Sequence, residues 1–328
     1  MQNIKQNMTT IQTCQFHDIS AIQMENDRLK VIIIPESGGK LQSIFDKHLN
    51  REFLYQSTDV KFKRGVYGGS FLDGDLSGFD DMFPSINACL YPDQPWQGVM
   101  VPDHGEVWSL PWEFEIEQEA LVLRVHGVKF PYMLEKRISF QSSSEVRADY
   151  ALWNFSPYSL KYIWAAHPLL NIEDGSRLII PTNGKIINAL SGSSRLGAYG
   201  AIHDWPLAGS SNGEASDMRV ITPNLGKSEK YYVLGETGVG RSVLYHSLHK
   251  QYISFSYPPE KVKYLGVWVN ENGPFIAQNN VAIEPCTGLM DSIDIADRFN
   301  QLAKIEAYGQ ACWFLLIETG QAENIEDL

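Results

Sequence analysis

The sequence predicts an all-β protein in which large antiparallel sheets pack against each other. Short runs of apolar and β-branched residues recur along the chain, and clusters of Gly, Pro, Asn, Asp and Ser separate them. Runs of this kind, bounded by turn residues, are typical of β-strands. Only one stretch, 291–307, has the apolar spacing of a helix. Many strands and few helices favour antiparallel sheets that pack face to face.

The expected strands are spread over most of the chain. The first clear one is LKVIIIP at 29–35, a β-branched run that ends at a proline and is closely followed by Ser-Gly-Gly. Segments 121–128 and 146–153 alternate between apolar and mixed faces, as half-buried strands do. Similar runs lie at 160–166, 252–257, 264–270, 281–284 and 312–318.

The one expected helix is supported by apolar residues three to four positions apart, Ile295, Phe299 and Leu302. Asp291 or Ser292 is placed to cap its N-terminus.

No internal repeat, heptad pattern or low-complexity linker divides the sequence. We therefore expect a single domain over 1–328, with 1–15 as a loosely ordered N-terminal segment. The Gly-, Ser- and Asn-rich stretch 191–216 is the only long excursion, and in a compact domain such a loop is more often a cover for a site than a domain boundary.

Composition excludes several classes of function. The 27 Lys and Arg against 39 Asp and Glu give a net charge of -12, which disfavours nucleic acid and anionic membranes as partners. No apolar run approaches the roughly 20 residues of a membrane helix, and the first residues lack the apolar core of a signal peptide. The four cysteines lie far apart without a C-x-x-C pair, which predicts free thiols in a reducing cytoplasm. Whether the protein is a monomer or a homodimer stays open.

Three ionisable residues stand out as candidates for chemistry. His104 precedes Gly105 in VPDHGEVWSLPW, so backbone can approach a ligand closely there. His167 closes LKYIWAAHP, where Pro168 is expected to end the strand. Glu284 follows an apolar run in a buried-looking strand, where a carboxylate is costly unless it is paired or used.

Metal sites are not expected. His246 and His249 have H-x-x-H spacing but no accompanying acid, so zinc is disfavoured. DGDLSGFDD at 73–81 opens like a calcium loop, but Pro84 stands where the bidentate Glu would be. A sugar-facing acidic loop or a solvated turn is the preferred interpretation.

Five motifs in chain order resemble the aldose 1-epimerases, the galactose mutarotase family. They run from about residue 29 to the C-terminal part of the chain, and "GFDDMFPSI" resembles a bacterial mutarotase-like subgroup. The motifs are PESGGKLQSIFD, GFDDMFPSI, DHGEVWSLPW, AAHPLLNI and AIEPCTG.

The resemblance implies a β-supersandwich and an isomerase that interconverts the α and β anomers of a hexose or modified hexose, without metal or redox cofactor. It implies that Glu284 removes the anomeric hydroxyl proton and that His167 protonates the ring oxygen. His104 would hydrogen-bond near that oxygen, and Trp268 could stack on the sugar or belong to the core. Trp108 or Trp112 would wall or support the pocket.

The chain departs from the family at the substrate contacts. The segment G-R-Y-x-N-R-I, which supplies a substrate-binding arginine, is absent, and Arg64 is the nearest candidate. The family's sugar-binding aspartate has no clear counterpart, and Asp80, Asp81 or Asp204 could take its place.

Two other functions fit the same scaffold. A hexose-6-phosphate 1-epimerase could hold phosphate with the basic cluster Lys61, Lys63 and Arg64. A non-catalytic carbohydrate-binding protein is the other alternative, although a pure binder needs no acid–base pair.

The motifs also predict the geometry of the site. Asp80, Asp81 and His104 are expected to border one open cleft. Glu284 and His167 are expected to face each other across a sugar-sized gap, with His104 beside His167.

Overall fold

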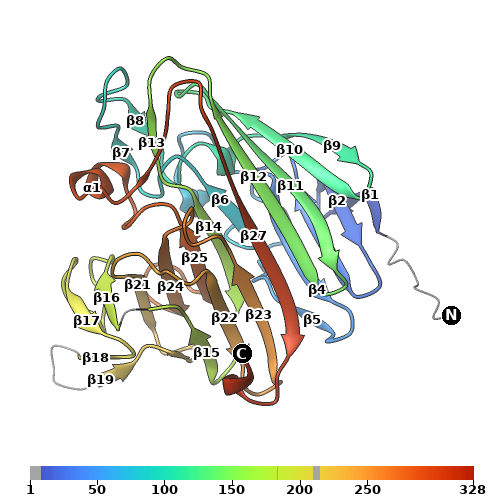
Figure 1. Ribbon diagram of the computed structural model, residues 1–328. Helices are drawn as coiled ribbons and strands as arrows, with labels where there is room; N and C mark the ends of the chain where they lie inside the picture. Colours follow the sequence, from blue (N-terminus) through green and yellow to red (C-terminus); the bar gives the residue numbers. More distant parts are fainter. Residues whose placement is uncertain (1–8, 183, 210–214) are drawn as a thin grey trace.

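Two large antiparallel sheets form the body of the molecule (Figure 1). The computed structural model describes residues 9–182, 184–209 and 215–328. Side chains from both sheets join one large apolar core. The prediction of an all-β protein with packed antiparallel sheets is confirmed. None of the described helices has the length and apolar composition of a membrane-spanning segment.

The first sheet holds 12 strands within the described residues, and β5 (Arg51–Glu52) pairs with β4 beside its main path. In spatial order the other strands are β1 (Thr10–Phe16), β2 (Ile19–Glu25), β3 (Leu29–Ile34), β4 (Lys40–Asp46), β6 (Phe79–Met82), β14 (Ala165–Asn171), β25 (Asn279–Cys286), β24 (Tyr264–Glu271), β21 (Lys227–Val233), β16 (Lys185–Asn188) and β17 (Ile202–Asp204).

The second sheet holds nine strands in the same described part of the chain. In spatial order these are β20 (Val220–Ile221), β15 (Ser176–Ile179), β22 (Arg241–His246), β23 (Gln251–Ser256), β27 (Gln310–Gln321), β12 (Glu145–Asn154), β11 (Tyr132–Ser142), β10 (Ala120–His126) and β9 (Glu113–Glu117).

Short elements complete the fold. Three strand pairs stand apart from the two sheets within the described ranges, β7 (Cys89–Leu90) with β8 (Met100–Val101), β13 (Leu160–Tyr162) with β26 (Ala303–Ile305), and β18 (Leu207–Gly209) with β19 (Ala215–Asp217). The described helical segments are α1 (Ile293–Arg298) and the 3-10 turns Phe71–Asp73, Val107–Ser109 and Ile325–Asp327.

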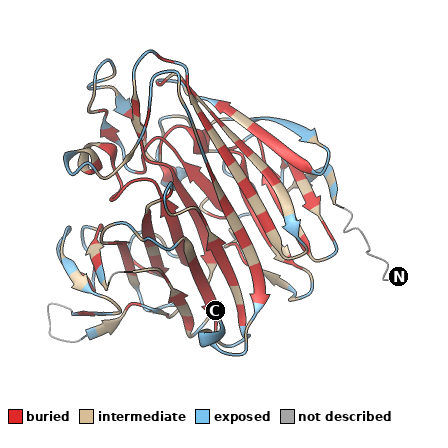
Figure 2. Ribbon diagram, viewed as in Figure 1, coloured by how far each residue is buried: buried red, intermediate tan, exposed pale blue. Residues whose placement is uncertain are grey.

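Burial differs between the two sheets in a way that locates the site (Figure 2). β12 alternates strictly between buried and half-buried residues, as a strand with one covered face does. β14, β25 and β24 are buried along nearly their whole length. The first sheet is therefore covered on both faces at its centre, on one side by the second sheet and on the other by long loops.

The expected helix is much shorter than 291–307. α1 ends at Arg298, and Asn300 follows in the left-handed region at φ 53, which stops helical hydrogen bonding. Ser292 lies at the cap position, but its side chain makes no capping hydrogen bond. Phe299 is exposed, and Leu302 precedes the short strand β26, so the apolar spacing does not mark one helix face.

Two expected boundaries also differ from the structure. Thr10–Phe16 pairs with β2 along its length, so residues 10–15 belong to the sheet, and residues 1–8 lie outside the described part. β14 and β25 continue through Pro168 and Pro285, each of which lies opposite a residue of a neighbouring strand. His167 and Glu284 are therefore near the middle of the sheet rather than at a rim.

Candidate active site

Strand register brings one row of residues together on the face of the first sheet that points away from the second. His167 lies opposite Asp80 of β6. On the other side, β14 pairs with β25: Ala165 lies opposite Cys286 and Leu169 opposite Ala282. The same register places His167, midway between residues 165 and 169, opposite Glu284. Glu284 is opposite Gly266, and Gly266 is opposite Tyr232. Directly opposed residues share a face at close spacing, so the row runs without a break across five strands.

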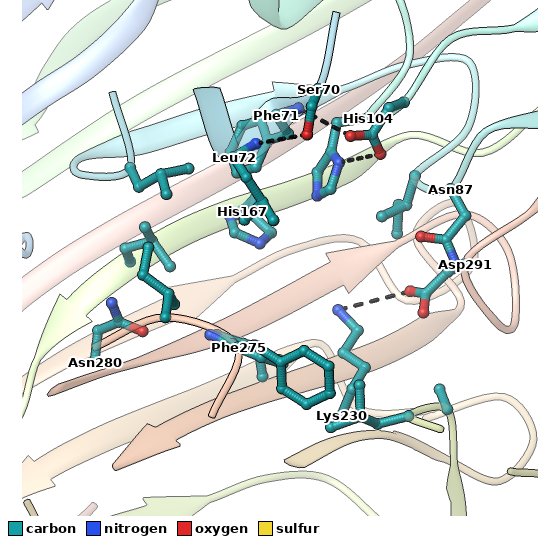
Figure 3. A pocket seen from close by; sticks show the side chains of 18 of the residues that line it. Ser70, Phe71, Leu72, Asn87, His104, His167, Lys230, Phe275, Asn280 and Asp291 are labelled. Atoms are coloured by element: carbon teal, nitrogen blue, oxygen red, sulfur yellow. Dashed lines mark hydrogen bonds and ion pairs between the residues drawn. The ribbon is translucent and has the colours of Figure 1, made fainter. Parts of the chain in front are cut away.

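A cavity of about 320 Å³ lies beside this row; His167 lines it, whereas Glu284 and the other three residues of the row do not. Its size is at the lower end of the range for small-molecule sites. Figure 3 shows His104, His167, Lys230 and Asp291 around the same space. Aromatic and aliphatic walls come from Phe71, Leu169, Leu190, Trp268 and Phe275, and polar lining groups include Asn87, Asp103, Gln278 and Asn280.

His167 and Glu284 form an acid–base pair across two adjacent strands. Nε2 of His167 is 3.7 Å from Oε1 of Glu284. The Glu284 side chain is fully buried, and its Oε1 has no hydrogen-bond partner among the described residues. Burial raises the pKa of the Glu284 carboxyl, opposed by Lys230. Burial also holds the pKa of His167 well below its usual value, and the Lys230 charge adds to this effect.

The expectation of a sugar-sized gap between these two groups is wrong. Residues opposed on adjacent strands are too close to hold a ring between them. A bound sugar would have to lie over the pair instead. Since the anomeric hydroxyl and the ring oxygen belong to neighbouring ring positions, two adjacent groups can serve both.

His104 lies beside His167, as expected, with their ring centroids 5.9 Å apart. Nδ1 of His104 is 2.8 Å from Oδ1 of Asp103. The imidazole stacks on Phe71 with the ring centroids 4.0 Å apart, and Trp108 makes an edge contact with the same phenyl ring. Trp108 therefore supports the cavity wall without lining it. The contact with Asp103 and the stacking on Phe71 together fix the direction of the His104 ring.

The backbone around His104 depends on the following glycine. His104 and Gly105 both have positive φ, 57 and 78. A Cβ on Gly105 would lie 2.1 Å from the carbonyl oxygen of Phe83, which is an impossible contact. The predicted close backbone approach at Gly105 exists, but the approaching group is the protein's own backbone rather than a ligand.

Lys230 is a site residue that sequence reasoning missed. It lies on β21 opposite Trp268, lines the cavity, and is 6% exposed. Its ammonium group donates to Oε2 of Glu284 and lies 3.7 Å from Oδ1 of Asp291. Burial lowers the pKa of the ammonium, but Glu284 and Asp291 outweigh it and raise that pKa overall. Lys230 is thus a permanent cation beside the acid–base pair.

Asp80 is not a cleft residue. Its carboxylate is buried, does not line the cavity, and lies 2.9 Å from the Lys40 ammonium. The same ammonium donates to the carbonyl oxygens of Asp75 and Ser77 at 2.6 Å each. The Lys40 ammonium therefore occupies the position among the oxygen atoms of loop 73–81 where a calcium ion would have to bind. This arrangement does not favour calcium binding by the loop.

Asp81 points to the opposite face of the sheet, because successive residues of a strand alternate. In the core between the sheets it accepts hydrogen bonds from Lys136 at 2.7 Å and from the Trp164 indole at 3.0 Å. The expectation that Asp80 and Asp81 share a cleft with His104 is therefore wrong.

The remaining candidates divide between the cavity and the surface. Trp268 lines the cavity, as the stacking hypothesis requires. Arg64 is more than half exposed and is paired with Glu36, away from the cavity lining, so it is not placed to bind the substrate. Asp204 is likewise exposed and paired with Lys185.

The histidine pair with H-x-x-H spacing has structural partners. His249 bonds Glu173, and His246 lies near the Ser176 hydroxyl. Among the described residues, no group of three or more His, Cys, Asp or Glu side chains could hold a metal ion.

Comparisons with solved structures give the fold. A galactose mutarotase-like protein from Lactobacillus casei ATCC 334 matches this chain with a TM-score of 0.67 and 20% identity, and the match covers 92% of this chain and 100% of that protein. This chain has the galactose mutarotase-like fold. A Klebsiella pneumoniae protein described provisionally as an aldose 1-epimerase has a TM-score of 0.71 and 12% identity, covering 98% of this chain and 85% of its own. A Synechocystis protein matches at 0.71 with 16% identity, over 94% of this chain and 99% of its own.

Comparisons of sequence give less information about this chain than comparisons of structure. Residues 6–100 match a family described as a domain of unknown function, DUF5107. A search of curated proteins finds no match. The galactose mutarotase-like fold confirms the expected β-supersandwich, and at these identities it leaves the reaction to be argued from the site.

Proposed function

We propose that this protein is an isomerase of the aldose 1-epimerase type, which interconverts the α and β anomers of a hexose or modified hexose. The observation that carries the proposal is the pair formed by His167 and Glu284, 3.7 Å apart at the edge of a cavity beside His104. Names of neighbours with the same fold, a galactose mutarotase-like protein and a provisional aldose 1-epimerase, point to the same reaction class.

The proposed reaction needs proton transfers alone. Glu284 takes the proton of the anomeric hydroxyl while His167 gives a proton to the ring oxygen, and the C1–O bond of the ring breaks to leave an open-chain aldehyde. Rotation about C1–C2 and closure on the other face reverse these transfers, so acid and base exchange roles. Burial raises the pKa of Glu284, which makes its carboxylate a stronger base, and lowers the pKa of His167, which makes its protonated imidazole a stronger acid.

A neutral sugar fits the site better than a sugar phosphate. Lys230, the cation in the cavity wall, is already paired with Glu284 and close to Asp291. The exposed Lys63 and Arg64 have their own carboxylate partners outside the cavity lining. The amide groups of Asn87 and Asn280 and the Trp268 ring all line the cavity, and they suit the hydroxyls and the apolar face of a neutral pyranose.

The test is anomer exchange on a panel of freshly dissolved sugars and sugar phosphates, followed by polarimetry or NMR saturation transfer. Glu284→Gln keeps the shape and removes the base, so kcat should fall by about 10²-fold or more. His167→Asn should behave similarly. His249→Asn is the control, because His249 is exposed and bonded to Glu173 away from the cavity lining.

Sugar binding should survive these substitutions better than turnover. A Glu284→Gln variant that anomerises every parent substrate at the wild-type rate would show that the base is another group. A wild-type protein that binds sugars and exchanges no anomers would favour the non-catalytic binder.

A further inference from the structure

Glu284 cannot remain charged at its position without a cation. Its side chain has no exposed surface, and a buried carboxylate without a partner neutralises itself by taking up a proton. Among the described residues, the Lys230 ammonium and the His167 imidazole are the basic groups within ion-pair distance of it. Burial disfavours the charged form of His167. Lys230 is therefore the group that can keep Glu284 ionised.

The surroundings of Lys230 are shaped to direct it at Glu284. Gly266 lies between Glu284 and Tyr232 in the row of opposed residues. A Cβ there would come within 3.3 Å of Oε2 of Glu284, the oxygen that Lys230 contacts, and within 3.0 Å of the Tyr232 ring. The absent side chain thus leaves the space in which the lysine reaches across from β21.

Asp291 is the second carboxylate near the Lys230 ammonium, and it lies farther from it than Glu284 does. Its Oδ1 accepts a hydrogen bond from the Tyr232 hydroxyl at 2.6 Å and lies 3.7 Å from the Lys230 Nζ. Figure 3 shows the ammonium group between Asp291 and the two histidines. The Lys230 ammonium is closer to Glu284, to which it donates a hydrogen bond, than to Asp291.

We infer that Lys230 is a positioning residue for the proposed isomerase: its ammonium holds Glu284 as an oriented carboxylate beside His167. The inference rests on the proposed function, which it deepens by making the acid–base pair dependent on a third group. The cation of the site is then Lys230, which acts through Glu284, and not Arg64, which was expected to bind the substrate.

Several other groups face this network, and their charges enter its pH dependence. They are Cys286 on β25, Tyr232 on β21, Asp291 after β25, His104 in the loop before the turn Val107–Ser109, and Lys40 on β4, which acts on His167. All of them are kept in the variants below, so differences between variants report on Lys230.

The test compares Lys230→Gln, which keeps a donor and removes the charge, with Lys230→Arg, which keeps the charge. The ionised form of Glu284 is the active base, so Lys230→Gln should move the acid limb of the pH profile of kcat/KM to higher pH. The loss of kcat should be larger in mildly acid than in mildly alkaline buffer, with KM little changed. Lys230→Arg should restore the wild-type limb.

Lys136→Gln is the matched control, because Lys136 forms a second fully buried ion pair, with Asp81, outside the cavity lining. It should lower the free energy of unfolding as Lys230→Gln does, yet leave the acid limb in place. A wild-type limb in Lys230→Gln, or an equal displacement in Lys136→Gln, would overturn the role of Lys230.

A second readout needs no substrate. The imidazole of His167, followed by NMR in ligand-free protein, should titrate at higher pH in Lys230→Gln, because a nearby positive charge is removed. It should not move in Lys136→Gln. An unmoved His167 titration in Lys230→Gln refutes the inference about Lys230, whereas absent anomer exchange by the wild-type protein refutes the proposed function.

Discussion

Replacing Asp80 by Asn should change how stability depends on pH. Burial raises the pKa of Asp80 from 3.8 to about 6, even though Lys40 opposes the shift. Folding therefore favours the protonated form, and the stability that this group contributes is fully present below pH 3.8 and is lost as the pH rises through about 6. At about 1.36 kcal/mol per pH unit, the difference amounts to about 3 kcal/mol.

Asn has nearly the same shape and does not titrate. The Lys40 ammonium keeps its two carbonyl partners, from Asp75 and Ser77, in the variant. Relative to wild type, Asp80→Asn should therefore gain about 2–3 kcal/mol of unfolding free energy between about pH 4 and about pH 7. Urea titrations at a series of pH values measure both proteins directly.

The result also decides what Asp80 does. Because its carboxylate lies outside the cavity lining, KM for a turned-over sugar should stay at the wild-type value. A difference in unfolding free energy that is constant with pH would refute the burial argument. A KM raised by about tenfold, equivalent to 1.4 kcal/mol, would restore Asp80 as a sugar contact.

Two further expectations concern the backbone at His104 and metals. Gly105→Ala should lose more than about 1 kcal/mol of stability, because positive φ and the Phe83 carbonyl both oppose a side chain. Gly98→Ala is the control, because Gly98 has a similar φ of 82 but open space where the Cβ would lie, so it reports the backbone strain without a clash. Equal losses of stability in the two variants, measured by thermal unfolding, would contradict the clash at Gly105. Dialysis against EDTA should leave anomer exchange unchanged, since the proposed steps are proton transfers; a loss reversed by one divalent ion would contradict this.

The strands could be predicted because their signals are local. β3, β10, β12, β23, β24 and β27 all lie where runs of β-branched and aromatic residues end at turn residues. The helix at 291–307 was overestimated for the same reason. Apolar spacing there is real, but Asn300 in the left-handed region and the pairing of β26 with β13 override it.

The site was predictable where one residue's own neighbours carried the information. His104 was marked by its glycine and Glu284 by an apolar strand, and both are in the site. Asp80 and Asp81 were misplaced because 79–82 was not recognised as a strand, whose alternation separates them.

Lys230 was not predicted as a site residue, because the register between strands that are far apart in the sequence cannot be read from the residues around Lys230. The available signal was a lysine between Glu229 and two tyrosines in the short strand β21, where all but one residue is buried. Once that strand is known, such a lysine requires a buried partner. The partner lies 54 residues further along the chain.

The charges around His167 follow from the two buried lysines on either side of its row. Lys40 is paired with Asp80 on one neighbouring strand, and Lys230 is paired with Glu284 on the other side. Burial lowers the pKa of His167 first, and the charges of Lys230, His104 and Lys40 lower it further. The imidazole is therefore neutral at neutral pH, with one nitrogen free to accept a proton and one able to donate. In the proposed reaction Glu284 is the base and His167 gives a proton to the ring oxygen, so the imidazole has to take up a proton before it can act, and its lowered pKa makes that proton easy to release. The two ion pairs, rather than contacts to the sugar, would then set the pH at which the site works.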